Sequence, residues 1–308
     1  MDAVYLYKHS PFDDFELRYS LRSLAKFAPY IRKVWIFGDR PKFISEDESL
    51  IQHIPHEYTA RIAGVRTPVT NFGLLMALAS LIPELDFEYL QLSDDHFLLK
   101  DYPIEQARKT RIHGDMADAT PPPMQLLNGW TRTLWRTADT LKYLGYTAYN
   151  FETHTPRRLT KKMVFEAYSD LRDFFTEDSF YGVTGPTAIL NHAYKNEKVE
   201  LTLLKEENQL AGFWSQATAY KAPTYEEVKK ETEGKTFLNF NDGAFGDGLR
   251  QYLMEKFPEP SKYEKASHRG DAFAGGNQGA NVSWHNFSRQ PNPSPSPIQR
   301  NTETKVFG

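Results

Sequence analysis

The sequence predicts an α/β fold with a mostly parallel sheet, and two patterns in its first hundred residues support that prediction. Short apolar runs typical of strands alternate with stretches in which apolar residues recur every three or four positions, as in a helix. Such alternation favours parallel strands joined by right-handed crossovers. The composition agrees with a packed core, because 40% of the 308 residues are hydrophobic.

Periodicity places the elements of the first half. A strand is predicted at residues 3–7, and a helix at 15–28, where apolar residues recur at helical spacing until Pro29. Apolar β-type runs at 34–37 and 51–54 predict the next two strands.

Further along, an apolar-rich helix is predicted at 72–82, and a strand at 87–92 that runs into a polar turn. The second half is predicted to contain helices at 131–143, 161–175 and 248–257 and a strand at 237–240. Asp247 is placed to cap the last helix.

The composition changes near residue 265. Residues 266–308 are rich in Gly, Pro and Ser and hold few apolar residues, so they cannot bury enough surface to offset the entropy lost on ordering. We therefore expect a disordered tail. Residues 1–265 are interpreted as one domain with a helical insertion at about 120–235.

Several classes of protein are excluded by composition. The chain has no cysteine, which rules out disulfides, thiol nucleophiles and Cys-ligated metals. The net charge of −3 gives no overall attraction to nucleic acid or membranes. No apolar run approaches the ~18 residues of a membrane span, and no signal peptide is recognisable, so we expect a cytoplasmic protein without membrane insertion.

Asp94-Asp95 is the sharpest chemical feature. Two adjacent carboxylates at the end of an apolar strand repel each other unless a cation or hydrogen-bond donors compensate. A divalent metal would do so, and it would also neutralise charge on a diphosphate leaving group. The alternative is that the aspartates only cap the following turn.

Three further groups are candidates. His154, in His154-Thr155-Pro156, could take a proton from an acceptor hydroxyl, although it could also be an ordinary loop residue. Arg18 and Arg22 share a helix face and could clamp a diphosphate, or could form surface ion pairs. Asn241 and Asp242, after a predicted strand, could orient a ligand or cap the next helix.

Four segments, in order, resemble the Stealth family, which contains bacterial capsular-polysaccharide phosphotransferases and the lysosomal-enzyme N-acetylglucosamine-1-phosphotransferase. The most specific is Glu16–Leu24 with Ala28–Val34, which is similar to the family's signature helix and strand. The others are Tyr89–Leu98, His154-Thr155-Pro156, and Phe237–Asp242 with Phe257–Glu264. The resemblance spans residues 1–264.

The resemblance implies a GT-A-like nucleotide-sugar-binding core and a divalent cation, Mn²⁺ or Mg²⁺. By matching position, Asp94 and Asp95 would hold the metal and the diphosphate, and His154 would be the base. The catalytic residues implied are therefore His154 and Asp95. The substrate contacts implied in the same way are Arg18, Arg22, Asn241 and Asp242.

The chain departs from the family pattern in three places. Lys8–Pro11 replaces a Trp-x-Asp-Gly-type turn, Met76 stands where the family has a glutamate, and no arginine matches near Phe180–Gly185. Because an acid and an arginine are missing, we expect glycosyl transfer from a nucleotide-sugar to an acceptor hydroxyl, with sugar-1-phosphate transfer as the alternative.

The expected partners are a nucleotide-sugar donor and a glycan acceptor. A hydroxymethylated base in phage DNA is an alternative acceptor, and it would need a basic groove to bind the DNA backbone. The residues available for such a groove are Arg132, Arg136, Arg157, Arg158, Lys161 and Lys162. A non-catalytic glycan- or nucleotide-binding protein is the alternative from a different class.

Overall fold

The computed structural model describes residues 1–10, 12–121, 123, 129–178, 182–197, 199–214 and 222–265. Contacts along the chain divide it at Ala272 and Phe273. All described residues belong to the first unit, which precedes this division, and the predicted tail, 266–308, lies outside them.

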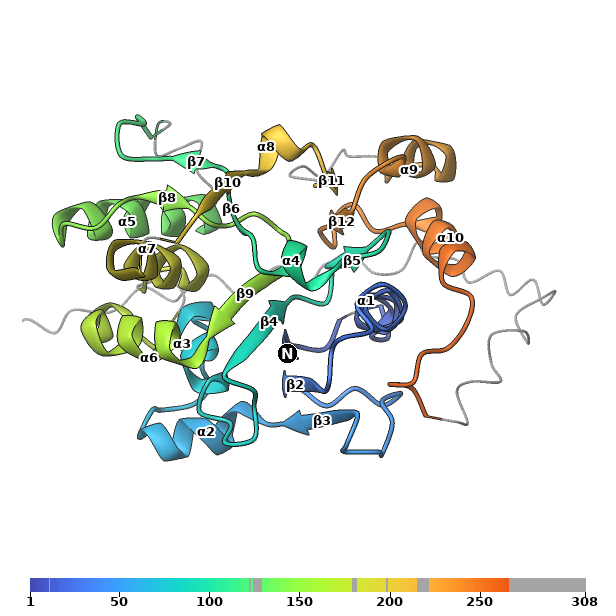
Figure 1. Cartoon of the computed structure of the whole chain (residues 1–308), viewed down its shortest axis with the longest axis horizontal. Helices are drawn as coiled ribbons and strands as arrows, with labels where there is room; N and C mark the ends of the chain where they lie inside the picture. Colours follow the sequence, from blue (N-terminus) through green and yellow to red (C-terminus); the bar gives the residue numbers. More distant parts are fainter. Residues whose placement is uncertain are drawn as a thin grey trace, which may run out of the picture. The chain divides into compact units, whose positions relative to one another are not determined.

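A five-stranded sheet forms the centre of the first unit (Figure 1). Its strands, in spatial order, are β3 (Ile51–Ile54), β2 (Val34–Gly38), β1 (Asp2–Tyr7), β4 (Glu88–Leu92) and β9 (Arg157–Thr160). The first four are parallel, and β9 runs antiparallel to β4. This order confirms the predicted α/β core with a mostly parallel sheet.

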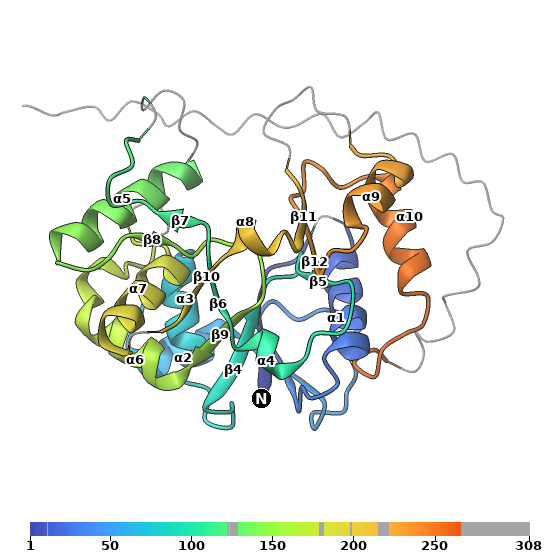
Figure 2. The same ribbon diagram turned by 45° about the horizontal axis from the view of Figure 1, so that its top comes forward.

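Helices cover both faces of this sheet, because side chains alternate along each strand. Ala3 and Tyr5 of β1 pack with α1 (Phe15–Phe27), whereas Val4 of the same strand belongs to the cluster that includes α3 (Phe72–Ala79). The second cluster also takes in α6 (Lys161–Asp170) and α7 (Gly185–Glu197). Figures 1 and 2 both show α1 on one side of β4 and α3, α6 and α7 on the other.

A smaller, three-stranded sheet lies next to the carboxyl end of β4. Its order is β11 (Leu210–Phe213), β12 (Phe237–Phe240) and β5 (Phe97–Leu98), with β5 antiparallel to β12. Helices α9 (Tyr225–Thr232) and α10 (Asp247–Lys256) pack on it through one apolar cluster. Since β5 follows β4 after a four-residue turn, this pairing brings the end of β12 to the end of β4.

The remaining elements are short or peripheral. They are the strand pairs β10 (Leu201–Leu203) with β6 (Thr110–Ile112) and β7 (Gly114–Asp115) with β8 (Tyr149–Asn150), and the helices α2 (His56–Ala63), α4 (Ile104–Ala107), α5 (Gly129–Tyr143) and α8 (Leu204–Glu207). The segment predicted as a helical insertion, 120–235, contains helices, and it also supplies β9 and β11 to the sheets. The division into a core and an insertion stays a prediction.

Several predicted ends differ from the structure. Helix α3 ends at Ala79, and α6 ends at Asp170, followed by a 3₁₀ turn at Arg172–Phe174. Asp247 is the first residue of α10 rather than its cap, because Gly246 occupies the capping position. In the part of the chain that the structure describes, no helix combines the length and the apolar character that crossing a membrane requires.

Candidate active site

The site lies where the carboxyl end of β4 meets the end of β12 and the first residue of β9. Asp94 and Asp95 follow β4 directly, as the sequence predicts. The Asn239 side chain on β12 donates a hydrogen bond to the backbone oxygen of Asp95 (3.1 Å). Arg157 lies opposite Gln91 in the antiparallel pairing, so it enters at the same edge. Parallel sheets place their ligands at this edge.

The negative charges of Asp94 and Asp95 repel each other. Burial, the charge of Asp95 and then those of Glu16 and Asp242 raise the pKa of Asp94 well above its usual range. Burial and the charge of Asp242 raise the pKa of Asp95 to about 6, although Asn239 and Arg157 oppose the rise. The Asp95 side chain keeps 27% of its surface exposed, so a ligand can reach it. The cluster is therefore short of positive charge.

Glu16 on α1 is a member of this cluster that the sequence analysis did not single out. It is buried (3% exposed) and accepts a hydrogen bond from the Ser10 hydroxyl. Burial and the charges of Asp242 and Asp95 raise its pKa to about 7. Its position in the first helical turn is a usual place for an acid and gave no signal of proximity to the aspartates.

Arg157 is a buried cation beside Asp95, and it too was not assigned to the site from the sequence. Its Nη1 donates to Gln91 Oε1 (3.0 Å), its Nε donates to the Phe151 carbonyl (3.2 Å), and its Nη2 lies 3.7 Å from Glu152 Oε2. Burial lowers the pKa of Arg157. These contacts fix one positive charge at the aspartate pair, although no arginine matched the family pattern further along the chain.

His154 is connected to the aspartates through Trp214. The His154 and Trp214 rings lie 5.4 Å apart, and Trp214 Nε1 donates to Asn239 Oδ1 (3.0 Å). Asn239 in turn holds Asp95. Burial, Arg157 and His113 lower the pKa of His154 to about 4, so the imidazole is neutral at neutral pH. A neutral imidazole can accept a proton.

The two arginines of α1 have different surroundings. Arg22 is buried and directs its donors at both Glu264 oxygens (2.8 Å each) and at the carbonyls of Phe257 (3.0 Å) and Pro258 (3.3 Å). The structure therefore does not bring Arg22 to the site as a phosphate contact. Arg18 lies over the Phe43 ring (4.8 Å), and its Nε is buried without a hydrogen-bond partner in the described part of the chain.

Asn241 and Asp242 lie at the end of β12. Asn241 Oδ1 accepts a hydrogen bond from the Ala244 backbone (3.2 Å), so this side chain also stabilises the turn that precedes α10. Asp242 is exposed, and its charge acts on Asp94, Asp95 and Glu16. Of the pair, Asp242 has the closer electrostatic link to the aspartates.

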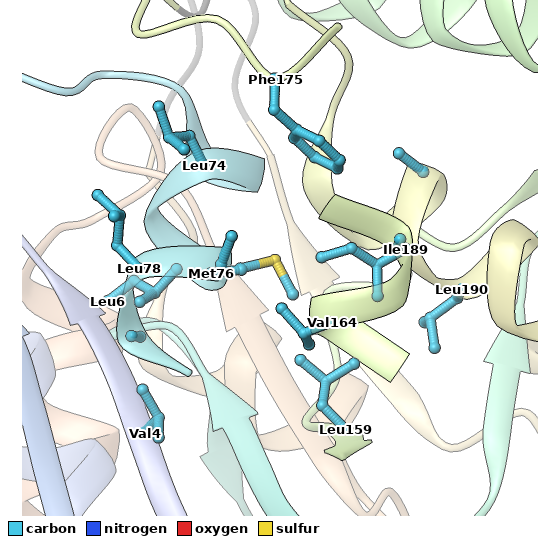
Figure 3. Packing of buried hydrophobic residues seen from close by; sticks show 14 of the residues in the cluster. Val4, Leu6, Leu74, Met76, Leu78, Leu159, Val164, Phe175, Ile189 and Leu190 are labelled. Carbon is cyan, nitrogen blue, oxygen red and sulfur yellow. The ribbon is translucent and has the colours of Figure 1, made fainter. Parts of the chain in front are cut away.

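The described residues do not assemble a complete set of metal ligands. Among the described residues, no group of three or more His, Asp or Glu side chains is arranged to hold a metal ion. Mg²⁺ commonly binds through one or two carboxylates together with waters and substrate phosphates, so two aspartates fit such an ion. Met76 has no carboxylate to offer a metal ion. Its side chain is buried in the apolar cluster with Val164 and Ile189 (Figure 3).

Four of the six basic residues considered for a DNA groove are buried or bound to other groups of the protein. Arg157 is buried, and Arg158 pairs with Glu88 (2.9 Å). Lys161 donates to backbone carbonyls, and Lys162 pairs with Glu166 and Glu197. Arg158 and Lys162 are thus paired with carboxylates, whereas Lys161 is held by neutral carbonyl groups.

The fold and the site together define an α/β protein with an acidic, histidine-containing site at the carboxyl edge of its sheet. Residues 12–112 match the model of Stealth protein CR2, conserved region 2. The chain is 23% identical over 279 residues to the exopolysaccharide phosphotransferase CpsY of Mycobacterium leprae, a match that covers 82% of this chain and 49% of the relative. The chain thus contains the conserved region 2 of Stealth proteins and, over most of its length, resembles an exopolysaccharide phosphotransferase at low identity.

Other similarities are shorter or structural. The chain is 34% identical over 87 residues to the exopolysaccharide phosphotransferase SCO2592 of Streptomyces coelicolor, covering 27% of this chain and 9% of the relative. This chain thus spans half or less of the length of either relative. The solved structures that resemble it include two transferases.

The first is the galactosyltransferase LgtC in complex with donor and acceptor sugar analogs, with a TM-score of 0.43, 13% identity, and 83% of this chain and 96% of that chain covered. The second is mouse xyloside xylosyltransferase 1 in its apo form, with a TM-score of 0.40, 11% identity, and coverage of 80% and 99%.

Proposed function

We propose that this chain transfers a sugar-bearing group from a nucleotide-sugar to an acceptor hydroxyl, with a divalent cation held by Asp94 and Asp95. The observation that supports this most strongly is the pair of carboxylates at the end of β4, both with a raised pKa, beside a neutral histidine. Bound Mn²⁺ or Mg²⁺ would relieve the repulsion and neutralise charge on the leaving nucleotide.

Each protein group has a role in this proposal. Asn239 orients Asp95 through the backbone, and Arg157 holds a positive charge next to it. His154 accepts the proton of the attacking hydroxyl. Arg18, through its unpaired Nε, is the remaining arginine that we assign to the donor phosphates, since Arg22 is engaged by Glu264.

Two reactions are open to this site. In sugar-1-phosphate transfer, the acceptor oxygen bonds to the β-phosphorus, the bond from that phosphorus to the bridging oxygen breaks, and a nucleoside monophosphate leaves. In glycosyl transfer, the acceptor oxygen bonds to the anomeric carbon, the bond from that carbon to the β-phosphate oxygen breaks, and a nucleoside diphosphate leaves. In both, the hydroxyl proton passes to His154.

We place sugar-1-phosphate transfer first, which reverses the order expected from the sequence. The reason is that both curated relatives are named exopolysaccharide phosphotransferases. Glycosyl transfer is the second candidate, because Met76 puts an apolar residue where the family resemblance implies an acid. A glycan is the acceptor that fits both reactions. We do not propose modified DNA as an acceptor.

Binding of the donor tests the metal role before any acceptor is known. Titration calorimetry with a panel of UDP-, GDP- and CDP-sugars should show binding that requires Mn²⁺ and is lost in Asp95→Asn. Asp39→Asn, which changes an aspartate after β2, is the matched control and should bind as wild type does. Binding that is equally tight without metal and in Asp95→Asn would refute the metal assignment.

A further inference from the structure

Trp214 is a large aromatic side chain at the site that keeps an open surface. It follows β11 and is 41% exposed, whereas Trp35 in the sheet core is completely buried. An exposed indole loses the stabilisation that burial gives a large apolar ring. A ring in this position therefore invites a ligand.

The Trp214 ring is held in a fixed place. Its Nε1 is anchored on Asn239 Oδ1 (3.0 Å). The ring lies back over its own strand at Gly212, where an added Cβ would come within 1.9 Å of the indole Cη2. One side of the ring is thus covered by β11, and binding on the other side would cost little ordering entropy.

The fixed ring lies beside the proposed base. The Trp214 and His154 centroids are 5.4 Å apart with the planes inclined at 48°, and the anchoring residue Asn239 also bonds to Asp95. A flat ligand on the open face of Trp214 would hold its rim next to the imidazole. A pyranose suits this arrangement, because one face carries C–H groups and its rim carries hydroxyls.

We propose that the open face of Trp214 is the stacking platform for a pyranose ring of the acceptor glycan. This inference rests on the proposed function for the identity of the acceptor. The neighbourhood of His154 favours the acceptor over the base of the donor nucleotide, because the attacking hydroxyl must reach the group that takes its proton.

Steady-state kinetics of the full chain test the assignment. Trp214→Ala should raise the acceptor KM by roughly 5- to 160-fold, the range that corresponds to removing an aromatic side chain on which a nucleic-acid base stacks, with the nucleotide-sugar Kd unchanged. Gly212→Ala should act in the same direction, since it displaces the ring without removing it. Trp130→Ala, which removes another exposed indole (45%) on α5, should leave the acceptor KM unchanged.

Glycan binding without donor separates this inference from the proposed function. In Asp95→Asn, short oligosaccharides of glucose, mannose, galactose and N-acetylglucosamine would be added while the indole N–H resonances are followed by NMR. A shift of the Trp214 resonance would support the platform even if no transfer were ever detected. No shift with any of these sugars, an unchanged acceptor KM in Trp214→Ala, or a weakened nucleotide-sugar Kd instead, would overturn it.

Discussion

Arg22 and Glu264 form a buried bidentate ion pair across 242 positions of the sequence, with both N–O distances at 2.8 Å. The pair fastens α1 to the segment that follows α10. Glu264 also accepts hydrogen bonds from the Ser261 backbone and side chain, and Arg22 caps the Phe257 and Pro258 carbonyls. Since α1 carries Glu16 and Arg18, this clamp fixes the helix that borders the site.

Removing one partner of this clamp should destabilise the fold. Glu264→Gln leaves the buried guanidinium without its counter-charge, which typically costs about 3–5 kcal/mol. Urea unfolding followed by circular dichroism measures the change. Glu259→Gln, which removes an exposed carboxylate of the same segment, serves as the control and should fall within about 0.5 kcal/mol of wild type. An equally small effect for Glu264→Gln would contradict the clamp.

Without metal, the wild-type protein should be less stable to unfolding than a variant in which the charge of Asp95 is removed. Because Asp95 has its pKa raised to about 6 by burial and nearby charge, Asp95→Asn should stabilise the metal-free protein at pH 7.5 by about 1–3 kcal/mol. Thermal unfolding in EDTA would show a higher Tm for the variant. In Mn²⁺ the order should narrow or reverse, because only wild type gains stability from the ion. A lower Tm in EDTA would argue that Asp95 is stabilising without metal.

Glu16 should make stability depend on pH. Its folded pKa of about 7 lies above the ordinary 4.5, so the folded state binds more protons between those values and stability falls as pH rises from 4.5 to 7. The total fall attributable to this group is about 3 kcal/mol. Glu16→Gln should flatten the slope of unfolding free energy against pH, measured in EDTA. A slope identical to that of wild type would exclude Glu16 as its source.

His154 should affect turnover and not donor binding. Replacement by Ala removes the proposed proton acceptor, which typically costs about 10²–10⁴ in rate. The nucleotide-sugar Kd from calorimetry should stay within a few-fold of wild type. Since burial lowers the pKa of His154 to about 4, protonation of this residue should not limit the rate between pH 5.5 and 7. His113→Ala, which removes another histidine whose charge acts on His154, is the comparison variant, and equal losses in both would count against His154.

Local features of the sequence could be predicted, and long-range neighbours could not. Spacing and composition over short windows are enough to predict the helix at 15–27 and the Asp pair at the end of β4. Whether Arg22 meets a phosphate or Glu264 depends on a segment far along the chain, so helical spacing alone could not decide it. Arg157 joins the site only because β9 pairs antiparallel with β4 at Gln91. The link from Trp214 to Asp95 similarly needs the β5–β12 pairing.

The released nucleotide tests the central claim most directly. The protein would be incubated with Mn²⁺, a panel of nucleotide-sugars and an acceptor glycan mixture, and the products separated by ion-exchange chromatography beside an Asp95→Asn control. We predict acceptor-dependent release of a nucleoside monophosphate that is absent from the control. Release of a nucleoside diphosphate would assign glycosyl transfer instead. Release of neither, with donors shown by calorimetry to bind, would contradict a sugar transferase at this site.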